Sequence, residues 1–268
     1  MGKIVTFTNQ KGGVGKTTSC VNVACSVAMN GYKVLVLDMD PQGNATSSLR
    51  GNGDFDKNAK SIYDVLIGNV KTTDKNVIIK TEFDNLYIIP SNINLAGAEV
   101  ELATLQNNRE QLLLNALKPI KENFDFIFID CPPSLGLLTI NALTASNSVF
   151  IPIQCEYFAL EGLSQLMNTV KLIKKFLNPS LSVEGVLLTM YTNRSNLTKS
   201  VADEIKTFFG DFVYETIIPR NIRIAEAPSY GQPVVTYDPK SSGSLAYNLL
   251  TEEFLHRNNK EININASK

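Results

Sequence analysis

The chain has 268 residues, of which 44% are hydrophobic, so it can bury a substantial core as one large domain or two small ones. Its 25 Lys and Arg residues nearly balance 26 Asp and Glu residues, which argues against a protein that binds nucleic acid constitutively but allows a local basic patch. The four cysteines form no C-x-x-C pair and the only histidine is His256, which favours reduced, buried thiols over a disulfide or zinc framework.

Neither a secretory leader nor a membrane-spanning segment is predicted. Met1 to Lys3 lead directly into a short apolar run, and the longest apolar runs have the length of strands. A membrane-spanning helix needs ~20 apolar residues. We therefore expect a cytoplasmic protein without a membrane partner.

Short apolar runs alternate with longer helical segments. The first strand is expected at residues 4–8, followed by a helix at 16–30 that Gly31 ends, and then by an almost wholly apolar strand at 34–37. Further along we expect strands at 86–89, 126–129, 148–153, 184–188 and 213–217, and helices at 111–123, 160–176 and 199–208. This alternation predicts an α/β fold with a doubly wound, mostly parallel sheet and helices on both faces.

The domain organisation is expected to be simple. No Pro/Gly-rich linker and no repeat divides the chain, and residues 51–58 are polar enough to form a loop. The end of the chain is rich in Asn and Lys. We predict one domain over residues 1–256 and a disordered tail over 257–268.

A glycine-rich loop lies between the first predicted strand and helix. Residues 11–18 read KGGVGKTT, which matches the end of the pattern G-x-x-x-x-G-K-[ST], with Gln10 at the position of its first glycine. In such loops the backbone N–H groups surround phosphate oxygens, the lysine reaches the β- and γ-phosphates, and the hydroxyl binds Mg²⁺. These roles fall to Lys16 and Thr17. The predicted nucleotide-binding residues of the loop are Lys11, Gly12, Gly13, Val14, Gly15, Lys16, Thr17 and Thr18.

Three carboxylates follow predicted strands. Asp38, Asp40 and Asp130 all fall where a strand ends, and the carboxyl ends of parallel strands share one edge of the sheet. A single Asp before a turn commonly caps a loop, but three at one edge favour a ligand site. Phosphoryl transfer needs such charges and a positioned water more than it needs covalent groups.

Several sequence blocks, in the same order along the chain, carry a family resemblance. They are residues 11–18 (KGGVGKTT), 36–44 (VLDMDPQGN), 129–136 (IDCPPSLG), 143–146 (LTAS), 152–156 (PIQCE), 218–223 (IPRNIR) and 226–233 (EAPSYGQP). Together they resemble the ParA/Soj family of chromosome- and plasmid-partition ATPases, within the larger group that includes MinD and the nitrogenase iron proteins. The similarity extends over essentially residues 1–255, and it implies a P-loop NTPase fold with ATP and Mg²⁺ as cofactors.

The resemblance also implies roles for single residues. Lys11 corresponds to the signature lysine of the deviant Walker A loop, which contacts the nucleotide of the other subunit in an ATP-sandwich dimer. Asp40 corresponds to the residue that positions the attacking water, so the expected catalytic residues are Lys11, Lys16 and Asp40. The expected metal site consists of Thr17 with Asp38 and Asp130, the two carboxylates acting through water. Pro219, Arg220 and Asn221 resemble the stretch around the adenine.

Three outputs are compatible with this family group. A redox ATPase of the nitrogenase iron-protein type would need paired cysteines, and only Cys131 follows the expected Walker B aspartate. A MinD-like membrane switch would need a C-terminal amphipathic helix, whereas residues 257–265 carry apolar side chains only at Ile262 and Ile264.

A DNA-partition switch is the output that the sequence favours. Arg194 and Arg223 align with arginines that Soj-type proteins use for DNA, and non-specific binding of double-stranded DNA needs only phosphate neutralisation. The expected partners are a second copy of the chain, DNA, and a ParB/Spo0J-like centromere-binding protein that stimulates hydrolysis. The expected location is the cytoplasm, in association with the nucleoid.

Overall fold

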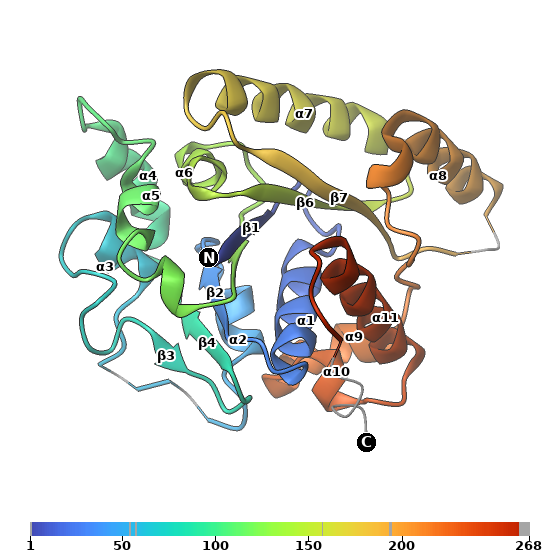
Figure 1. Cartoon of the computed structure of the whole chain (residues 1–268), viewed down its shortest axis with the longest axis horizontal. Coiled ribbons are helices and arrows are strands. Elements are labelled where there is room, and N and C mark those ends of the chain that lie inside the picture. Colours follow the sequence, from blue (N-terminus) through green and yellow to red (C-terminus); the bar gives the residue numbers. More distant parts are fainter. Residues whose placement is uncertain (1, 54, 57, 157, 193–194, 263–268) are drawn as a thin grey trace.

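The computed structural model describes residues 2–53, 55–56, 58–156, 158–192 and 195–262 (Figure 1). These residues form a seven-stranded sheet in the order β3-β4-β2-β5-β1-β6-β7. Every neighbouring pair is parallel except β3 and β4. The strands are β1 (Lys3–Phe7), β2 (Val34–Asp38), β3 (Ile79–Lys80), β4 (Leu86–Ile89), β5 (Phe126–Asp130), β6 (Ser148–Gln154) and β7 (Ser182–Thr189). The predicted α/β fold with a mostly parallel sheet is confirmed.

Helices cover both faces of this sheet (Figure 1). Those of the first half are α1 (Lys16–Met29), α2 (Asn44–Ser48), α3 (Ile62–Leu66), α4 (Leu95–Ala103), α5 (Leu112–Leu117) and α6 (Leu137–Ala145). Those of the second half are α7 (Ala159–Phe176), α8 (Asn196–Phe209), α9 (Ile222–Glu226), α10 (Val234–Tyr237) and α11 (Ser242–Arg257).

The core is divided by the sheet because side chains of a strand point alternately to its two faces. In β1, Val5 and Phe7 pack with α1, α10 and α11, whereas Ile4 packs on the opposite face with α3 to α6. The outer strands β6 and β7 form a third core cluster with α7 and α8. Strands buried on both faces read as continuous apolar runs, which is why they could be predicted from the sequence.

Two predicted elements are wrong. The strand expected at residues 213–217 is reduced to one bridge between Val213 and Val186, because the N–H groups of Glu215 and Thr216 donate to the Glu253 carboxylate on α11 (2.9 and 3.0 Å). The helix expected at 111–123 divides into α5 and a 3₁₀ turn at Lys121–Asn123. Pro119 lies between them, and a proline has no N–H to continue a helix.

The predicted disordered tail begins too early. Arg257 is the last residue of α11, and its guanidinium donates to the Val213 carbonyl (2.9 Å) and to Glu253 (2.7 Å). The Tyr32 hydroxyl donates to the carbonyl of Glu261 (2.7 Å), so the chain is held at least that far. Residues 263–268 lie outside the described part.

The topology places the loop after β1 at the point where strand order reverses. From β1 the chain crosses to β2 and β4 on one side, returns through β5, and then continues to β6 and β7 on the other side. Open α/β sheets bind their ligands at the carboxyl ends of the strands next to such a reversal. The glycine-rich loop and all three predicted carboxylates lie at this edge.

Candidate nucleotide site

The glycine-rich loop has the backbone that a phosphate site needs. Gly13 (φ 74) and Gly15 (φ 85) adopt left-handed conformations, which only glycine enters without steric cost. Gly15 is the N-cap of α1, and no side chain among the described residues caps that end. The first N–H groups of α1 therefore face the loop, where an anion can accept their hydrogen bonds. Val14 is buried, and its carbonyl accepts a hydrogen bond from the Thr189 hydroxyl (2.9 Å), which anchors the loop.

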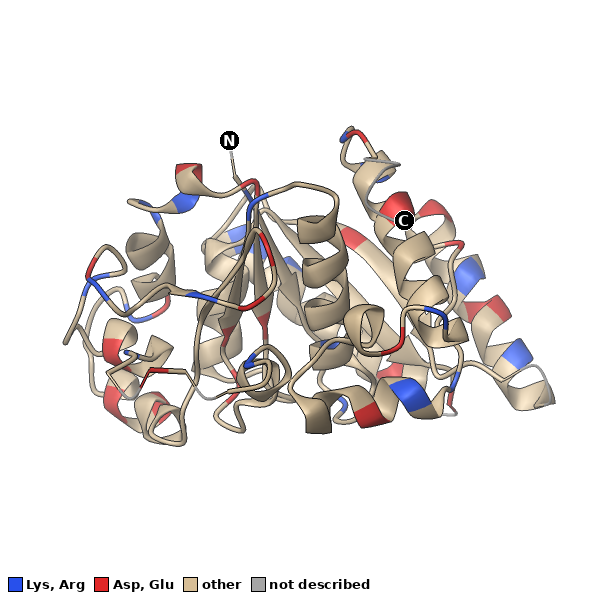
Figure 2. Ribbon diagram, turned by 90° about the horizontal axis from the view of Figure 1, so that it is seen from below, with Lys and Arg blue, Asp and Glu red and all other residues tan. Residues whose placement is uncertain are grey.

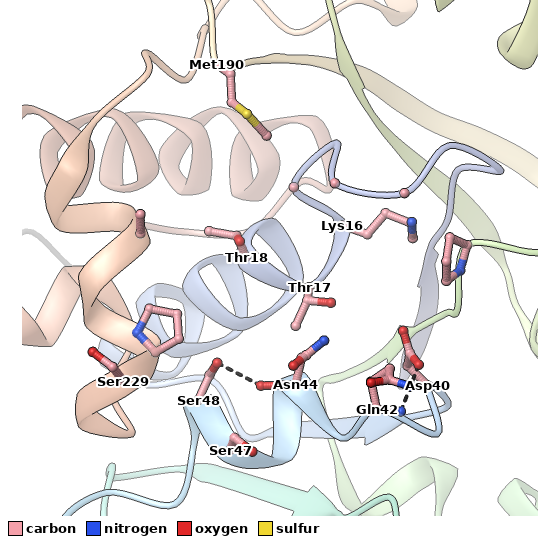
Figure 3. Close-up of a pocket in the computed structure, with 16 residues that line it drawn as sticks. Lys16, Thr17, Thr18, Asp40, Gln42, Asn44, Ser47, Ser48, Met190 and Ser229 are labelled. Atoms are coloured by element: carbon pink, nitrogen blue, oxygen red, sulfur yellow. Dashed lines mark hydrogen bonds between the residues drawn. The ribbon is translucent and has the colours of Figure 1, made fainter. Parts of the chain in front are cut away.

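A cavity of about 680 Å³ opens beside this loop. Lys16, Thr17 and Asp40 lie around the same opening, with Asn44 and Ser48 of α2 across from the loop (Figure 3). The lining residues are Gly12, Gly13, Gly15, Lys16, Thr17, Thr18, Asp40, Gln42, Asn44, Ser47, Ser48, Pro133, Met190, Ala225, Pro228 and Ser229. Six of these sixteen residues belong to the loop that the sequence predicted to bind nucleotide, and Asp40 was predicted as a catalytic residue.

A second hollow of about 330 Å³ adjoins the first and shares five lining residues with it: Gly15, Thr18, Met190, Ala225 and Pro228. It contains the three residues predicted to surround the adenine, Pro219, Arg220 and Asn221. Its remaining walls come from Thr189, Ile218, Ile224 and Tyr247. A hollow of mixed apolar and polar character next to the cavity at the glycine-rich loop fits a purine base joined to a polyphosphate.

Lys16 is nearly buried, with 6% of its surface exposed. Its ammonium donates a hydrogen bond to the Lys11 carbonyl (3.1 Å), which holds it across the loop. Burial lowers the pKa of Lys16, and the nearby carboxylates of Asp130 and Asp40 oppose that shift. A phosphate would replace this weak support by a direct charge-assisted contact.

Asp130 ends β5 with the Thr17 hydroxyl as a close neighbour of its carboxylate. Both of its carboxylate oxygens are buried, and neither has a hydrogen bond of normal geometry within the described residues. Burial raises the pKa of Asp130 well above its usual range, and the neighbouring Asp38 raises it further. An unsatisfied buried carboxylate is costly, so this group fits a hydrated cation in the cavity.

Asp38 is paired in register with Asp130 across β2 and β5, yet its hydrogen bonds go elsewhere. It accepts from the Thr46 N–H and hydroxyl (both 2.7 Å) and from the Asp40 N–H (3.1 Å). Burial raises the pKa of Asp38 to about 6, against the lowering effect of the bonds from Thr46. Asp38 therefore holds the loop that carries Asp40, and its role at the metal stays a prediction.

The donor set fits Mg²⁺ held mainly by phosphate and water. Within the described residues, no group of three or more His, Cys, Asp or Glu side chains converges to hold a metal ion. Mg²⁺ in nucleotide sites keeps several waters and uses one or two protein groups plus phosphate oxygens. Thr17 at the cavity and the unpaired Asp130 behind it would supply those groups.

Lys11 behaves differently from Lys16. Its side chain is 38% exposed and forms an ion pair with Glu156, which follows β6. Among the described residues, those that line the cavity include Lys16 but not Lys11. The Lys16 side chain thus lies at the cavity, whereas the Lys11 side chain pairs with Glu156.

The structure describes one of the two arginines that were predicted to contact DNA. Arg194 lies outside the described residues. Arg223, on α9, is half exposed and donates to Glu226 (2.9 Å), with its Nε also 3.3 Å from Asp238. It is therefore held by acidic neighbours within one subunit, and its contact with DNA stays a prediction.

Part of the lining was not predicted. Asn44, Pro133, Pro228 and Ser229 fall within the sequence blocks that carry the family resemblance, but no role followed from their chemistry. Met190 (φ 49) has a left-handed backbone that is rare for a residue with a side chain, and no sequence signal indicated it.

Comparison with known proteins decides the family. The profile of a family described as "AAA domain" matches residues 2–183. The chain is 55% identical over 254 residues to the sporulation initiation inhibitor protein Soj of Bacillus subtilis, covering 94% of this chain and 98% of that protein. It is 48% identical to the chromosome partitioning protein ParA of Myxococcus xanthus over 257 residues, covering 96% and 89% of the two chains. The chain belongs to the ParA/Soj family of partition ATPases.

Solved structures agree with this ParA/Soj assignment. A putative plasmid partition protein of Borrelia burgdorferi, bound to AMPPNP, superposes with a TM-score of 0.81 at 27% identity and covers 96% of this chain and 100% of its own. A cobyrinic acid a,c-diamide synthase of Mycobacterium smegmatis, with bound ADP and magnesium, gives a TM-score of 0.82 at 34% identity over 97% and 96% of the chains. The expected cofactors, ATP and Mg²⁺, are confirmed at the level of the family.

The redox-ATPase alternative can be compared with the structure of the ParA/Soj chain. All four cysteines, Cys20, Cys25, Cys131 and Cys155, are buried, so none is exposed to bridge a metal cluster between subunits. Among the described residues, no helix combines the length and the apolarity needed to cross a membrane.

The substitution Lys16→Ala tests the phosphate site. We expect ATP and ADP affinities to fall by about a hundredfold or more, because a buried charge-assisted contact to phosphate is lost. Isothermal titration calorimetry with both nucleotides measures this. Lys171→Ala, an exposed lysine on α7, is the matched control and should bind as the wild type does. Retained binding by Lys16→Ala would contradict the assignment.

Proposed function

We propose that the chain is an ATP-dependent dimerisation switch of a chromosome or plasmid partition system. In this proposal the apo and ADP forms are monomeric, and ATP joins two subunits into a sandwich that binds DNA. The observation that supports it is the position of Lys11: this lysine of the phosphate loop does not line its own cavity, and 38% of its side-chain surface is exposed.

The step from monomer to dimer requires Lys11 to leave Glu156. Their side chains are 38% and 46% exposed, and an exposed ion pair contributes only about 0–1 kcal/mol. A γ-phosphate on the facing subunit offers a stronger, charge-assisted contact. The exchange of Glu156 for a partner's phosphate is therefore favourable only while the triphosphate is present.

Hydrolysis would use groups at the edge of the same cavity. Mg²⁺, when bound, would neutralise charge on the phosphates. Asp40 is 7% exposed, lines the cavity, and is fixed by the Gln42 N–H, which donates to its Oδ1 (2.9 Å; Figure 3). A carboxylate fixed there can orient the attacking water. A slow intrinsic rate, raised by a ParB/Spo0J-like protein, would let the dimer persist until that partner arrives.

DNA binding would depend on the dimer because a single subunit is nearly neutral. In the view of Figure 2, basic and acidic residues are interspersed along the helices. A pair of weak cationic patches held together gains effective concentration on one duplex, which converts weak phosphate contacts into useful affinity. Arg223 and Arg194 are the residues that we propose for this contact. A MinD-like membrane-positioning ATPase is the alternative, and binding to anionic liposomes instead of DNA would support it.

Lys11→Ala tests the contact between subunits. The variant should bind ATP with the wild-type affinity but remain monomeric, because its own cavity is intact while the partner's phosphate loses its cation. Analytical ultracentrifugation with ATP and Mg²⁺ measures the dimer. Lys33→Ala, away from the cavity, is the control. A Lys11→Ala dimer of unchanged stability would refute the role.

Asp40→Ala tests the hydrolytic step. Loss of the group that positions the water should lower ATP turnover by about a hundredfold or more and trap the ATP-bound dimer. Phosphate release in single-turnover experiments measures this, with Asp74→Ala as an exposed control. Turnover at the wild-type rate would remove Asp40 from catalysis.

Arg223→Glu tests the DNA surface. We expect ATP-dependent dimerisation to persist while DNA affinity at low salt falls by more than about tenfold, because each dimer reverses two charges facing phosphate. Fluorescence anisotropy with a labelled duplex at two salt concentrations measures this. Arg109→Glu is a close control, since Arg109 is 44% exposed and also paired with an adjacent glutamate. Equal losses in both variants would count against a specific surface.

A further inference from the structure

Helix α4 and the residues just before it contact the two short helices that follow the Asp40 and Asp130 loops. Just before it, the Ser91 N–H donates to the Thr46 hydroxyl (2.9 Å), and that hydroxyl in turn donates to Asp38 (2.7 Å). From α4 itself, Glu99 extends toward α6, where its Oε1 accepts a long hydrogen bond from the Leu138 N–H (3.5 Å). The segment from Ser91 through α4 thus contacts α2, which follows the Asp40 loop, and the first turn of α6, which follows the Asp130 loop.

The approach of Glu99 to α6 is unusually close. A Cβ atom built on Gly136 would lie 2.2 Å from the Glu99 Oε1 and 3.0 Å from its Cδ. The backbone of Gly136 (φ -75, ψ -172) is one that any residue adopts. A side chain at position 136 would therefore displace the Glu99 carboxylate without straining the backbone.

Gly136 is the N-cap of α6, and α6 has no cap from its own chain segment. A carboxylate at a helix N-terminus pairs with unsatisfied N–H groups and with the positive end of the helix dipole. Glu99 supplies that group from another helix. The sequence just before α6 carries no cap signature, because the capping residue, Glu99, lies 39 positions before its partner Leu138.

The segment that α6 anchors borders the phosphate cavity. It runs from Asp130 through Pro133, which lines this cavity. The Cβ of Pro133 lies 3.7 Å from the position that a Cβ atom would take on Gly12 of the phosphate loop. The Thr139 hydroxyl on α6 donates to the Ser134 carbonyl (2.7 Å) and ties this segment to the helix. The position of α6 therefore determines where Pro133 meets the phosphate loop.

We propose that Glu99 is a positioning residue for nucleotide discrimination. By capping α6 across Gly136 it fixes the segment from Asp130 to Gly136 against the phosphate loop, and thereby favours the triphosphate over the diphosphate. The inference rests on the proposed function and deepens it, because a preference for ATP in the single subunit would add to the selection that the contact between subunits supplies.

A double-mutant cycle tests this link with the full chain. The variants are Glu99→Ala, Glu99→Gln, Gly136→Ala and the combination of Glu99→Ala with Gly136→Ala. The readout is the ratio of affinities for AMPPNP and ADP with Mg²⁺, which does not depend on hydrolysis. Glu101→Ala is the matched control, since Glu101 lies on the same helix and accepts from the Tyr63 hydroxyl (3.0 Å).

Glu99→Ala should lower the AMPPNP-to-ADP ratio by about fivefold, the size of a helix-cap contribution, with ADP affinity unchanged. Glu99→Gln keeps an acceptor oxygen of the same reach and should retain most of the preference. Gly136→Ala should act like Glu99→Ala because its methyl group displaces the carboxylate. The double variant should be no worse than either single variant, since both remove one interaction.

Additive losses in the double variant, or a ratio unchanged in Glu99→Ala, would overturn the inference. Equal losses for ADP and AMPPNP would also overturn it, because they would indicate general destabilisation. Absence of ATP turnover by the wild type would contradict the proposed function instead, and the affinity ratio would still decide the role of Glu99.

Discussion

The structure depends on an uncompensated acidic site at the edge of its central sheet. Parallel pairing of β2 and β5 puts Asp38 opposite Asp130, both fully buried, and Lys16 of the phosphate loop brings a nearby positive charge. Asp38 is neutralised in part by hydrogen bonds to Thr46, but Asp130 has none of normal geometry among the described residues. A hydrated Mg²⁺ and a polyphosphate would complete such a site, so nucleotide binding and the ordering of this edge depend on each other.

The same edge explains how a nucleotide could be sensed at the surface. Asp38 holds the loop of Asp40 through Thr46, and Thr46 accepts from Ser91 in front of α4. The loop after Asp130 leads into α6, where Glu99 of α4 lies over Gly136. Lys11 stands outside this network, in an exposed ion pair with Glu156. In the proposed switch, these hydrogen bonds would link the nucleotide site to the surface around α4, and Lys11 would exchange its ion pair with Glu156 for a contact with the other subunit.

The sequence predicted those features whose signals are local. The apolar strands and the loop of Lys16 and Thr17 were identified because burial on both faces and phosphate binding each impose a short pattern. The role of Glu253 was not predicted, because its hydrogen bonds from the Glu215 and Thr216 N–H groups join residues about forty positions apart. These bonds prevent a strand that propensity alone favours. Pro119 was a local signal against a continuous helix over residues 111–123, but the apolar residues of this stretch led us to predict one. The space at Gly136 has no local signal, since an ordinary backbone there conceals a tertiary contact.

The central claim is that two subunits associate only around Mg-triphosphate, and the molar mass in solution tests it most directly. Light scattering on the wild-type chain should be recorded at one protein concentration with Mg-ADP, with Mg-AMPPNP, and with AMPPNP plus EDTA. The account predicts a single 29.5 kDa subunit with Mg-ADP and in EDTA, and twice that mass with Mg-AMPPNP. One subunit in all three samples, or a dimer in all three, would contradict it.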